Sequence, residues 1–273
     1  MDTLRNSTPH YSLGYSAEFI GFLRGLAERE FRYVSPYLEP GMRVLDVGCG
    51  PGFLSVLLAQ GVAPGQLLGI DIEPSQVEIA RATGQRSGCD NASFQLADAL
   101  DLPSEDDQFD LVHAGGLLLH LPDTARALGE IHRVLRPGGT IVCRELLLDA
   151  VFVHPDRRQL LERGLQIFTD LIAADDGHPH IALVLKPSLR RAGFDEIELT
   201  ASFDIYDTPK RIEVFATLIE RWFLGGDLGR WAQSYGAASD DLLAEVSREL
   251  GAWRRNPDAL AGLAVATATA TKS

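Results

Sequence analysis

Residues 44–52 constrain the fold of this chain more than any other stretch. They read Val-Leu-Asp-Val-Gly-Cys-Gly-Pro-Gly, a short apolar run that leads into glycines on alternate positions. The residues that follow, 53–59, have the composition of a helix. Strand, glycine turn and helix form the unit by which an α/β domain brings bare backbone close to a nucleotide-like ligand. The stretch therefore predicts a ligand site at the start of a helix.

Strands and helices alternate along the first half of the sequence. Apolar runs separated by segments of helical spacing predict a parallel, doubly wound α/β sheet. The predicted strands are 43–47, 67–71, 93–98, 109–114 and 140–146, and the predicted helices are 16–35, 51–60, 73–86 and 123–135.

The pattern changes after residue 146. Residues 147–192 predict two helices around the polar loop 175–180, and residues 207–255 are mostly helical. A sixth strand is predicted at 196–203. The tail at 262–271 alternates small apolar residues with threonine, and threonine favours strands, so we predict a last strand there.

Composition excludes several classes of function. The formal charge of −13 would repel phosphate backbones, so we expect no nucleic acid partner. No apolar run reaches the roughly 18 residues that span a membrane, and the N-terminus does not resemble a signal peptide, so we expect a cytoplasmic protein without a membrane partner. The three cysteines give neither a disulfide framework nor a zinc spacing, and we predict no metal.

The glycine turn itself argues against a dinucleotide. Its third glycine, Gly52, comes one residue earlier than in the dinucleotide pattern, and Pro51 removes a backbone N–H where phosphates need donors. No Gly-Lys-Ser/Thr follows, so the turn is not a phosphate-binding P-loop. Asp46, just before the turn, would repel a pyrophosphate but favour an ammonium group.

Two further carboxylates follow predicted strands. Asp71 comes 21 residues after Gly50 and is placed to bind the hydroxyls of a ribose. Asp98, after the third strand, is placed for the exocyclic amine of a purine. A ribose, an adenine and a charged amino-acid tail together satisfy Asp46, Asp71 and Asp98, and S-adenosylmethionine carries all three groups.

With these residues in place, the chain resembles the class I S-adenosylmethionine-dependent methyltransferases of the small-molecule type. The resemblance covers about residues 42–146 and continues weakly at 189–194. Its segments are 44–52, Gly-Ile-Asp-Ile at 69–72, Asp-Ala at 98–99, Phe-Asp-Leu-Val-His-Ala at 109–114, Leu-His-Leu-Pro-Asp at 119–123 and Arg-Val-Leu-Arg-Pro-Gly-Gly at 133–139.

The resemblance implies a Rossmann-like, seven-stranded sheet, mostly parallel with an antiparallel last strand, and helical lid additions. It also implies one catalytic domain in four parts: a helical cap at 1–41, a cofactor-binding core at 42–146, a lid insertion at 147–192, and the end of the sheet at 193–273 with its helical insertion. The implied cofactor residues are Asp46, Gly48, Cys49, Gly50, Asp71, Ile72, Asp98, Ala99, His113 and Ala114.

Each of these roles has a structural alternative. Asp46 either contacts the cofactor's amino group or only ties the glycine loop together. Asp71 has an alternative as a helix cap. For Asp98, either Asp101 takes the ligand in its place or Asp98 is a simple turn residue. The His113 or Ala114 backbone is expected to face the ammonium group.

The catalytic residues stay open. His120 is a candidate base or a brace for the loop near the cofactor, and His178 and His180 are candidate bases or solvated loop residues. Tyr15 is a candidate pocket residue or a packing residue.

We therefore predict an enzyme that transfers a methyl group to an oxygen, nitrogen or carbon of a small apolar or aromatic metabolite, as in secondary metabolism. The alternative is a protein of the same fold and cofactor with a non-methylating reaction, such as cyclisation of a natural product. A homo-oligomer stays open.

Overall fold

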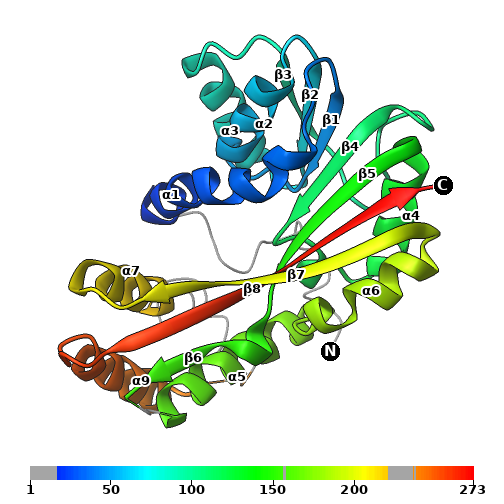
Figure 1. Ribbon diagram of the computed structural model, residues 1–273. Helices are drawn as coiled ribbons and strands as arrows, with labels where there is room; N and C mark the ends of the chain where they lie inside the picture. The colour runs from blue at the N-terminus through cyan, green and yellow to red at the C-terminus, as the bar shows by residue number, and fades with distance from the viewer. Residues whose placement is uncertain (1–16, 156–157, 221–235, 237) are drawn as a thin grey trace.

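The computed structural model describes residues 17–155, 158–220, 236 and 238–273, and a mixed sheet runs through its centre (Figure 1). The strands are β1 (Arg43–Val47), β2 (Gln66–Asp71), β3 (Ala92–Leu96), β4 (Phe109–Gly115), β5 (Leu135–Leu146), β6 (Phe152–His154), β7 (Phe194–Tyr206) and β8 (Leu260–Lys272). They lie in the order β3-β2-β1-β4-β5-β8-β6, and β7 pairs with the other edge of β8. Strands β1 to β5 are parallel, as predicted.

Helices cover both faces of this sheet, which makes it doubly wound. They are α1 (Ala17–Val34), α2 (Phe53–Val62), α3 (Pro74–Arg86), α4 (Thr124–Val134), α5 (Arg158–Ala174), α6 (Ile181–Arg191), α7 (Pro209–Ile219) and α9 (Asp240–Trp253). Successive residues of a strand point to opposite faces, and here they enter different cores. Leu111 and Val142 pack with residues of α2, whereas Val112 and Ile141 pack with residues of α4 and α6.

The alternating tail forms the antiparallel strand β8, as predicted, and its period of two places each residue type on one face. Ala266, Ala268 and Ala270 are buried in the larger core. Thr267 lies on the opposite face, where its hydroxyl accepts a hydrogen bond from Arg144 of β5 at 2.8 Å. Small alanines on one face and hydroxyls on the other thus allow β8 to be buried between β5 and β7.

The predicted number of seven strands is wrong, because the sheet has eight. The additional strand, Phe152–His154, lies inside the segment predicted as a purely helical lid insertion. It pairs with the start of β8 on the edge that β5 also uses, so β6 continues the path of β5 after a short interruption. Because three residues are too few to show the alternation of a strand, this strand could not be predicted from the sequence.

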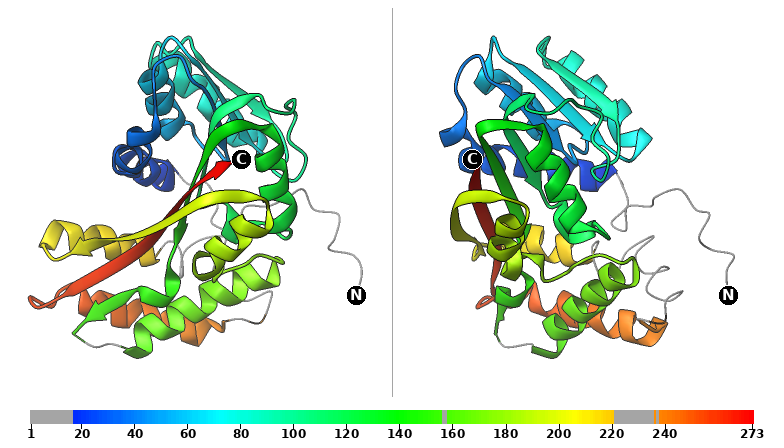
Figure 2. Two further views of the ribbon diagram at one scale, coloured as in Figure 1. Left: turned by 45° about the vertical axis from the view of Figure 1, so that its right-hand side comes forward. Right: turned by 90° about the vertical axis from the view of Figure 1, so that its right-hand side faces the viewer.

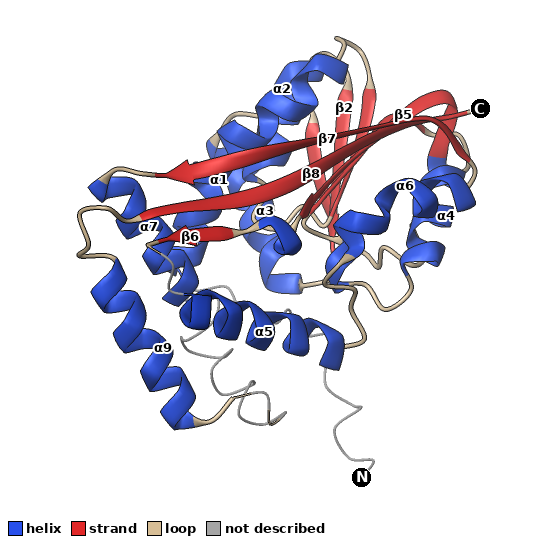
Figure 3. Ribbon diagram, turned by 60° about the horizontal axis from the view of Figure 1, so that its bottom comes forward, coloured by secondary structure: helices blue, strands red, loops and turns tan. Residues whose placement is uncertain are grey.

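β7 and β8 extend well past the carboxyl end of β5. The last residue of β5, Leu146, pairs with Val265, so the first five residues of β8, from Leu260, lie beyond it. Helices α5, α7 and α9 gather around this extension, away from β1, β2 and β3 (Figures 2 and 3). Three of the helices in the segments predicted as lid additions, α5, α7 and α9, thus lie beyond the carboxyl end of β5.

The first helix is held to the sheet by charged side chains. Glu30 pairs with Arg144 of β5, and the preceding residue, Arg29, pairs with Asp204 of β7. The Arg144 guanidinium also lies over the ring of Tyr33 at 3.8 Å. Because Arg144 is only 3% exposed, its positive charge is stabilised by these partners and not by water.

No helix among the described residues is long and apolar enough to cross a membrane.

Candidate functional site

The glycine turn has the backbone that its sequence predicts. Gly48, Gly50 and Gly52 have φ values of +74°, +50° and +74°, in the left-handed region that favours glycine. The N–H groups of Gly48 and Cys49 both donate to the Ile70 carbonyl of β2, at 2.9 and 2.8 Å. A Cβ at Gly52 would lie 2.9 Å from the side chain of Ala80, so α2 can begin here only with glycine. The turn therefore packs tightly against β2 and α3.

Asp71, at the end of β2, is tied to this turn. One carboxylate oxygen accepts from the Gly50 N–H at 2.8 Å, and the other accepts from the Glu73 N–H at 2.9 Å. Burial raises the pKa of Asp71, although both backbone hydrogen bonds lower it. The predicted alternative role as a helix cap is wrong, because Glu73 caps α3 through the Ser75 N–H.

Asp46 links three elements beneath the turn. One of its oxygens accepts from the Ser55 hydroxyl of α2 at 2.5 Å, and the other lies 2.8 Å from Nδ1 of His113 on β4. Asp46 and His113 are both buried. Gly115 leaves room for the imidazole, since a Cβ there would lie 2.9 Å from the ring. Each oxygen of Asp46 thus has a protein partner that ties the glycine loop to its neighbours.

Asp98 and Ala99 lie beside Asp71. The Ala97 N–H donates to the Asp71 carbonyl at 3.0 Å, which brings the end of β3 to the end of β2. Asp98 is exposed, and its carboxylate accepts from the Leu100 N–H at 2.8 Å, which is a turn contact. Ile72, directly after Asp71, is 43% exposed.

The ends of β1, β2, β3 and β4 therefore bring the predicted cofactor residues to one edge of the sheet. In α/β proteins, ligands bind outside the carboxyl ends of the strands, at the point where the strand order reverses. Here the order reverses between β1 and β4, and the glycine turn and Ala114 lie at that point.

The candidate bases lie next to this edge, in different settings. His120 ends the short 3-10 helix η2 (Leu118–His120), and burial lowers its pKa to about 4, so it is neutral near pH 7. The His178 N–H donates to the Leu119 carbonyl at 2.8 Å, which brings loop 175–180 against η2. Nδ1 of His180 lies 3.1 Å from Asp149. Tyr15 lies outside the described residues.

Two acidic residues near the candidate bases were missed by sequence reasoning. Glu145, fully buried at the end of β5, accepts from the N–H groups of Leu117 and Leu118 at 3.1 and 2.8 Å. Burial raises its pKa to about 8. Asp149 lies on the 3-10 helix η3 (Leu148–Ala150), just after β5. Asp149 follows the apolar run 146–148, which is a signal that the sequence offers, whereas Glu145 lies inside β5 between Arg144 and Leu146 and has no such signal.

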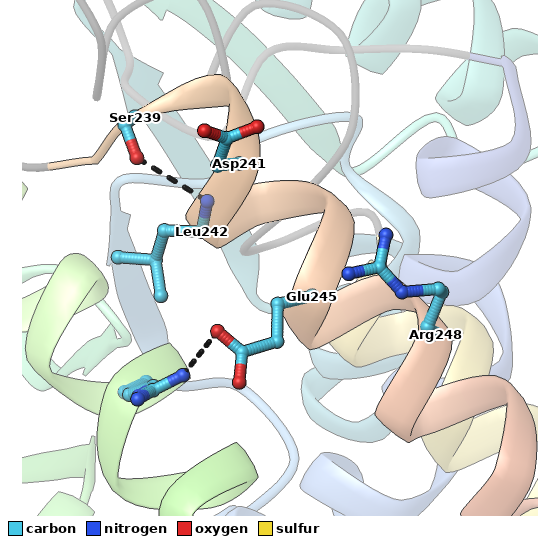
Figure 4. Close-up of a pocket in the computed structure, with 6 residues that line it drawn as sticks. Ser239, Asp241, Leu242, Glu245 and Arg248 are labelled. Atoms are coloured by element: carbon cyan, nitrogen blue, oxygen red, sulfur yellow. Dashed lines mark hydrogen bonds and ion pairs between the residues drawn. The ribbon is translucent and has the colours of Figure 1, made fainter.

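A cavity of about 610 Å³ lies between α5 and α9 in the lid (Figure 4). It has a charged lining, in which Arg163 pairs with Glu245 at 2.5 Å. None of its lining residues belongs to the predicted cofactor set, so this cavity is a feature of the lid. The lining residues are Arg163, Ser239, Asp241, Leu242, Glu245 and Arg248.

Known proteins with similar sequences are methyltransferases. Residues 38–161 match the family model of a methyltransferase domain. The chain is 37% identical over 222 residues to O-methyltransferase cnsE of Penicillium expansum, covering 79% of this chain and 71% of that protein. It is 36% identical over 190 residues to O-methyltransferase resE of Aspergillus sclerotiorum, covering 68% of this chain and 66% of that protein.

The fold is similar to that of a solved cyclase. The crystal structure of the (4+2) cyclase SpnF matches with a TM-score of 0.59 and 26% sequence identity. The match covers 90% of this chain and 81% of the cyclase.

Proposed function

Because the chain belongs to the class I S-adenosylmethionine-dependent methyltransferases, we propose that it methylates an oxygen atom of a small metabolite. The observation that carries the choice of oxygen is the identity of 37% and 36% to two proteins named O-methyltransferases. An apolar or aromatic acceptor of the secondary-metabolite type is supported by large apolar residues on α5, α7 and α9, among them Phe168, Phe215 and Trp253. Methyl transfer to nitrogen or carbon also occurs in this family, and the test below distinguishes these acceptors from oxygen.

The residues at the glycine turn fit S-adenosylmethionine. A Cβ added at Gly50 would meet nothing within 4 Å, so the turn presents bare backbone to open space. Ile72 offers an exposed apolar face directly after Asp71, as an adenine requires. Each Asp71 oxygen already holds one N–H group but, as a carboxylate oxygen, can accept another hydrogen bond.

We assign the roles as follows. The backbone of Gly48, Cys49 and Gly50 lines the methionine part, and Asp71 accepts from the ribose hydroxyls. Ile72 packs on the adenine, while Asp98 and the Ala99 N–H bind its edge. The backbone of His113 or Ala114 faces the ammonium group. Asp46 acts from below, since its two oxygens hold Ser55 and His113.

When bound, the cofactor supplies a methyl group that is already activated on a sulfonium. The protein then has to hold the acceptor oxygen in line with that methyl group and exclude water. Proximity and orientation supply roughly 7–11 kcal/mol at best. The lid at the carboxyl edge, built on the extension of β7 and β8, is placed to do both.

We further propose that the protein acts in the cytoplasm on a small molecule, without nucleic acid or membrane. A homo-oligomer is compatible with its exposed lid surfaces. Light scattering of the purified protein decides the oligomeric state. A protein recovered with membranes after cell fractionation would contradict this location.

Two measurements test the function. Calorimetry should detect binding of S-adenosylmethionine and of S-adenosylhomocysteine, and the absence of both would overturn the proposal. Incubation of the protein and methyl-labelled cofactor with a metabolite extract should then yield a labelled methyl ether, identified by mass spectrometry. Label on nitrogen or carbon would retain methyl transfer but refute the choice of oxygen.

The similarity to the cyclase SpnF supports a second candidate, cyclisation of a natural product. The same extract distinguishes it, because a cyclase isomerises its substrate without the mass gain of a methyl group. Cofactor binding together with an isomerised, unlabelled product would favour the cyclase.

A further inference from the structure

We propose that His180 is the general base of the methyl transfer and that Asp149 positions it. This inference rests on the proposed O-methylation. Nδ1 of His180 lies 3.1 Å from a carboxylate oxygen of Asp149, although 31 residues separate them in sequence. The pair is brought together only by the fold, because Asp149 follows β5 and His180 directly precedes α6.

Both residues are held at the carboxyl edge of the sheet. The Leu147 N–H donates to Ala264 of β8 at 3.0 Å, which fixes the backbone just before Asp149. On the other side, the His178 N–H donates to the Leu119 carbonyl at 2.8 Å. A Cβ at Gly177 would lie 2.6 Å from the same carbonyl, so glycine allows the close approach of this loop to η2.

This location is on the ligand side of the molecule. Strands β4 and β5 are parallel to β1 and β2, and the loops after all four lie at one edge. The glycine turn and Asp71 follow β1 and β2, whereas η2 and Asp149 follow β4 and β5. The cofactor residues and the histidine pair thus lie at the same carboxyl edge of the sheet, which is the edge where α/β proteins bind their ligands.

The contact has a chemical consequence. A carboxylate that accepts from Nδ1–H fixes the imidazole tautomer, so Nε2 carries the lone pair, and it stabilises the imidazolium that forms. The acceptor's O–H proton moves to Nε2 as its oxygen forms the bond to the methyl group. The S–CH₃ bond breaks, its electron pair stays on sulfur, and the proton then passes to solvent.

The other histidines near the edge are less suited to this step. His113 is buried, and its Nδ1 faces Asp46. His120 is a weak base, since burial lowers its pKa to about 4. His180 is 56% exposed at its side chain and Asp149 is 38% exposed, so the base can reach both an acceptor and water. A hydrogen bond this exposed adds little to the stability of the fold, so its main effect is on the orientation and tautomer of the imidazole.

Nitrogen-15 NMR of the imidazole rings tests the pair without any acceptor. In the wild-type protein His180 should be the Nδ1–H tautomer, whereas solvated histidines favour Nε2–H. Asp149→Asn should return His180 to the solvated pattern, and Asp149→Glu should preserve the wild-type one. A wild-type His180 with Nε2–H would overturn the positioning role.

Turnover of the acceptor identified with labelled cofactor tests the base. His180→Asn should lower kcat by roughly 10²–10⁴-fold, the usual contribution of general base catalysis. Asp149→Asn should lower kcat at least about tenfold while KM changes little, because the acceptor site is intact. Asp106→Asn, which removes an exposed carboxylate paired with Arg133, is the control and should leave kcat unchanged.

Binding of S-adenosylhomocysteine separates this inference from the proposed function. The His180→Asn variant should bind it as the wild type does, which also shows that the variant is folded. A variant that binds it and keeps kcat within threefold of wild type would overturn the base assignment and leave methyl transfer standing. A wild-type protein that binds no cofactor or turns over no acceptor would refute both.

Discussion

At the scale of single residues, Asp71 joins the glycine turn to the ribose site. Replacing it with alanine removes the acceptor of the Gly50 N–H and the proposed partner of two hydroxyls. Each hydrogen bond to a charged group contributes about 1.5–3 kcal/mol, so affinity for S-adenosylhomocysteine should fall about 100-fold or more. Calorimetry measures this change. Asp90→Asn, in an exposed turn, is the matched control, and equal affinity of the two variants would contradict the ribose assignment.

Glu145 gives the fold a dependence on pH. Its folded pKa is about 8, above the ordinary 4.5, so the folded state binds a proton that the unfolded state releases. The stabilisation that protonated Glu145 contributes is therefore complete below about pH 4.5. It is lost as the pH rises through about 8, by up to about 1.4 kcal/mol per pH unit. The neutral His120 has the opposite effect: its contribution to stability rises with pH, but only between about pH 4 and 6.5.

Urea unfolding between pH 6.5 and 8.5 therefore isolates Glu145 from His120. Over this range the wild-type midpoint should fall, and that of Glu145→Gln should fall less, because glutamine never ionises. Glutamine keeps an oxygen to accept from Leu117 and Leu118. Parallel pH profiles for the two proteins would show that Glu145 has no such effect.

Site residues that belong to a local sequence motif could be predicted from the sequence. Site residues that only the packing of distant segments brings together could not. Gly50 and Asp71 each follow a predicted strand and were both predicted as cofactor residues from the motif, and in the structure the Gly50 N–H donates to Asp71 at 2.8 Å. Asp149 and His180 share no motif, because loop packing brings them together. Glu145 follows the charged Arg144 as a surface acid could, and its burial depends on the backbone N–H groups of the loop after β4, including those of Leu117 and Leu118.

At the scale of elements, α1 is held by an ion pair that can be tested. Glu30→Gln leaves the buried Arg144 guanidinium with Thr267 and the ring of Tyr33 but without its carboxylate. Because Glu30 is 25% exposed, water replaces part of the loss, and the free energy of unfolding should fall by roughly 1–3 kcal/mol. Urea denaturation measures this change.

The lid provides the control for that measurement. Glu245 and Arg163 form a pair in which both side chains are more than 40% exposed. Glu245→Gln should therefore cost less than about 1 kcal/mol. If both substitutions have the same small effect, the Arg144 pair does not hold α1.

Elements with a clear period were predicted, and short or interrupted ones were not. The alternation of alanine and threonine was enough to predict β8 and, with the family resemblance, its antiparallel direction. The strand Phe152–His154 has no period of its own and exists because β8 extends beyond β5. β5 begins at Leu135, earlier than the strand predicted at 140–146, because Leu135 pairs with Phe109 across an irregularity in the ladder.

At the scale of the whole molecule, ligand binding should stabilise the fold. S-adenosylhomocysteine at 100 times its Kd adds about 2.7 kcal/mol if it binds only the folded state. For a chain of 273 residues this corresponds to a rise in Tm of about 5–10 °C. Differential scanning fluorimetry measures the rise, which Asp71→Ala should abolish at the same ligand concentration. A Tm that does not change with ligand would contradict the cofactor assignment.

The position of β8 also has a consequence for how the protein is made. This strand lies inside the sheet, between β5 and β7, yet it follows every strand with which it pairs in the chain. During synthesis, β1 to β5 emerge first and can pair with one another, whereas β7 cannot join the sheet until β8 is present between it and β5. The sheet can be completed only after β8 has been synthesised, so until then the nascent chain exposes the unpaired edges of β5 and β7.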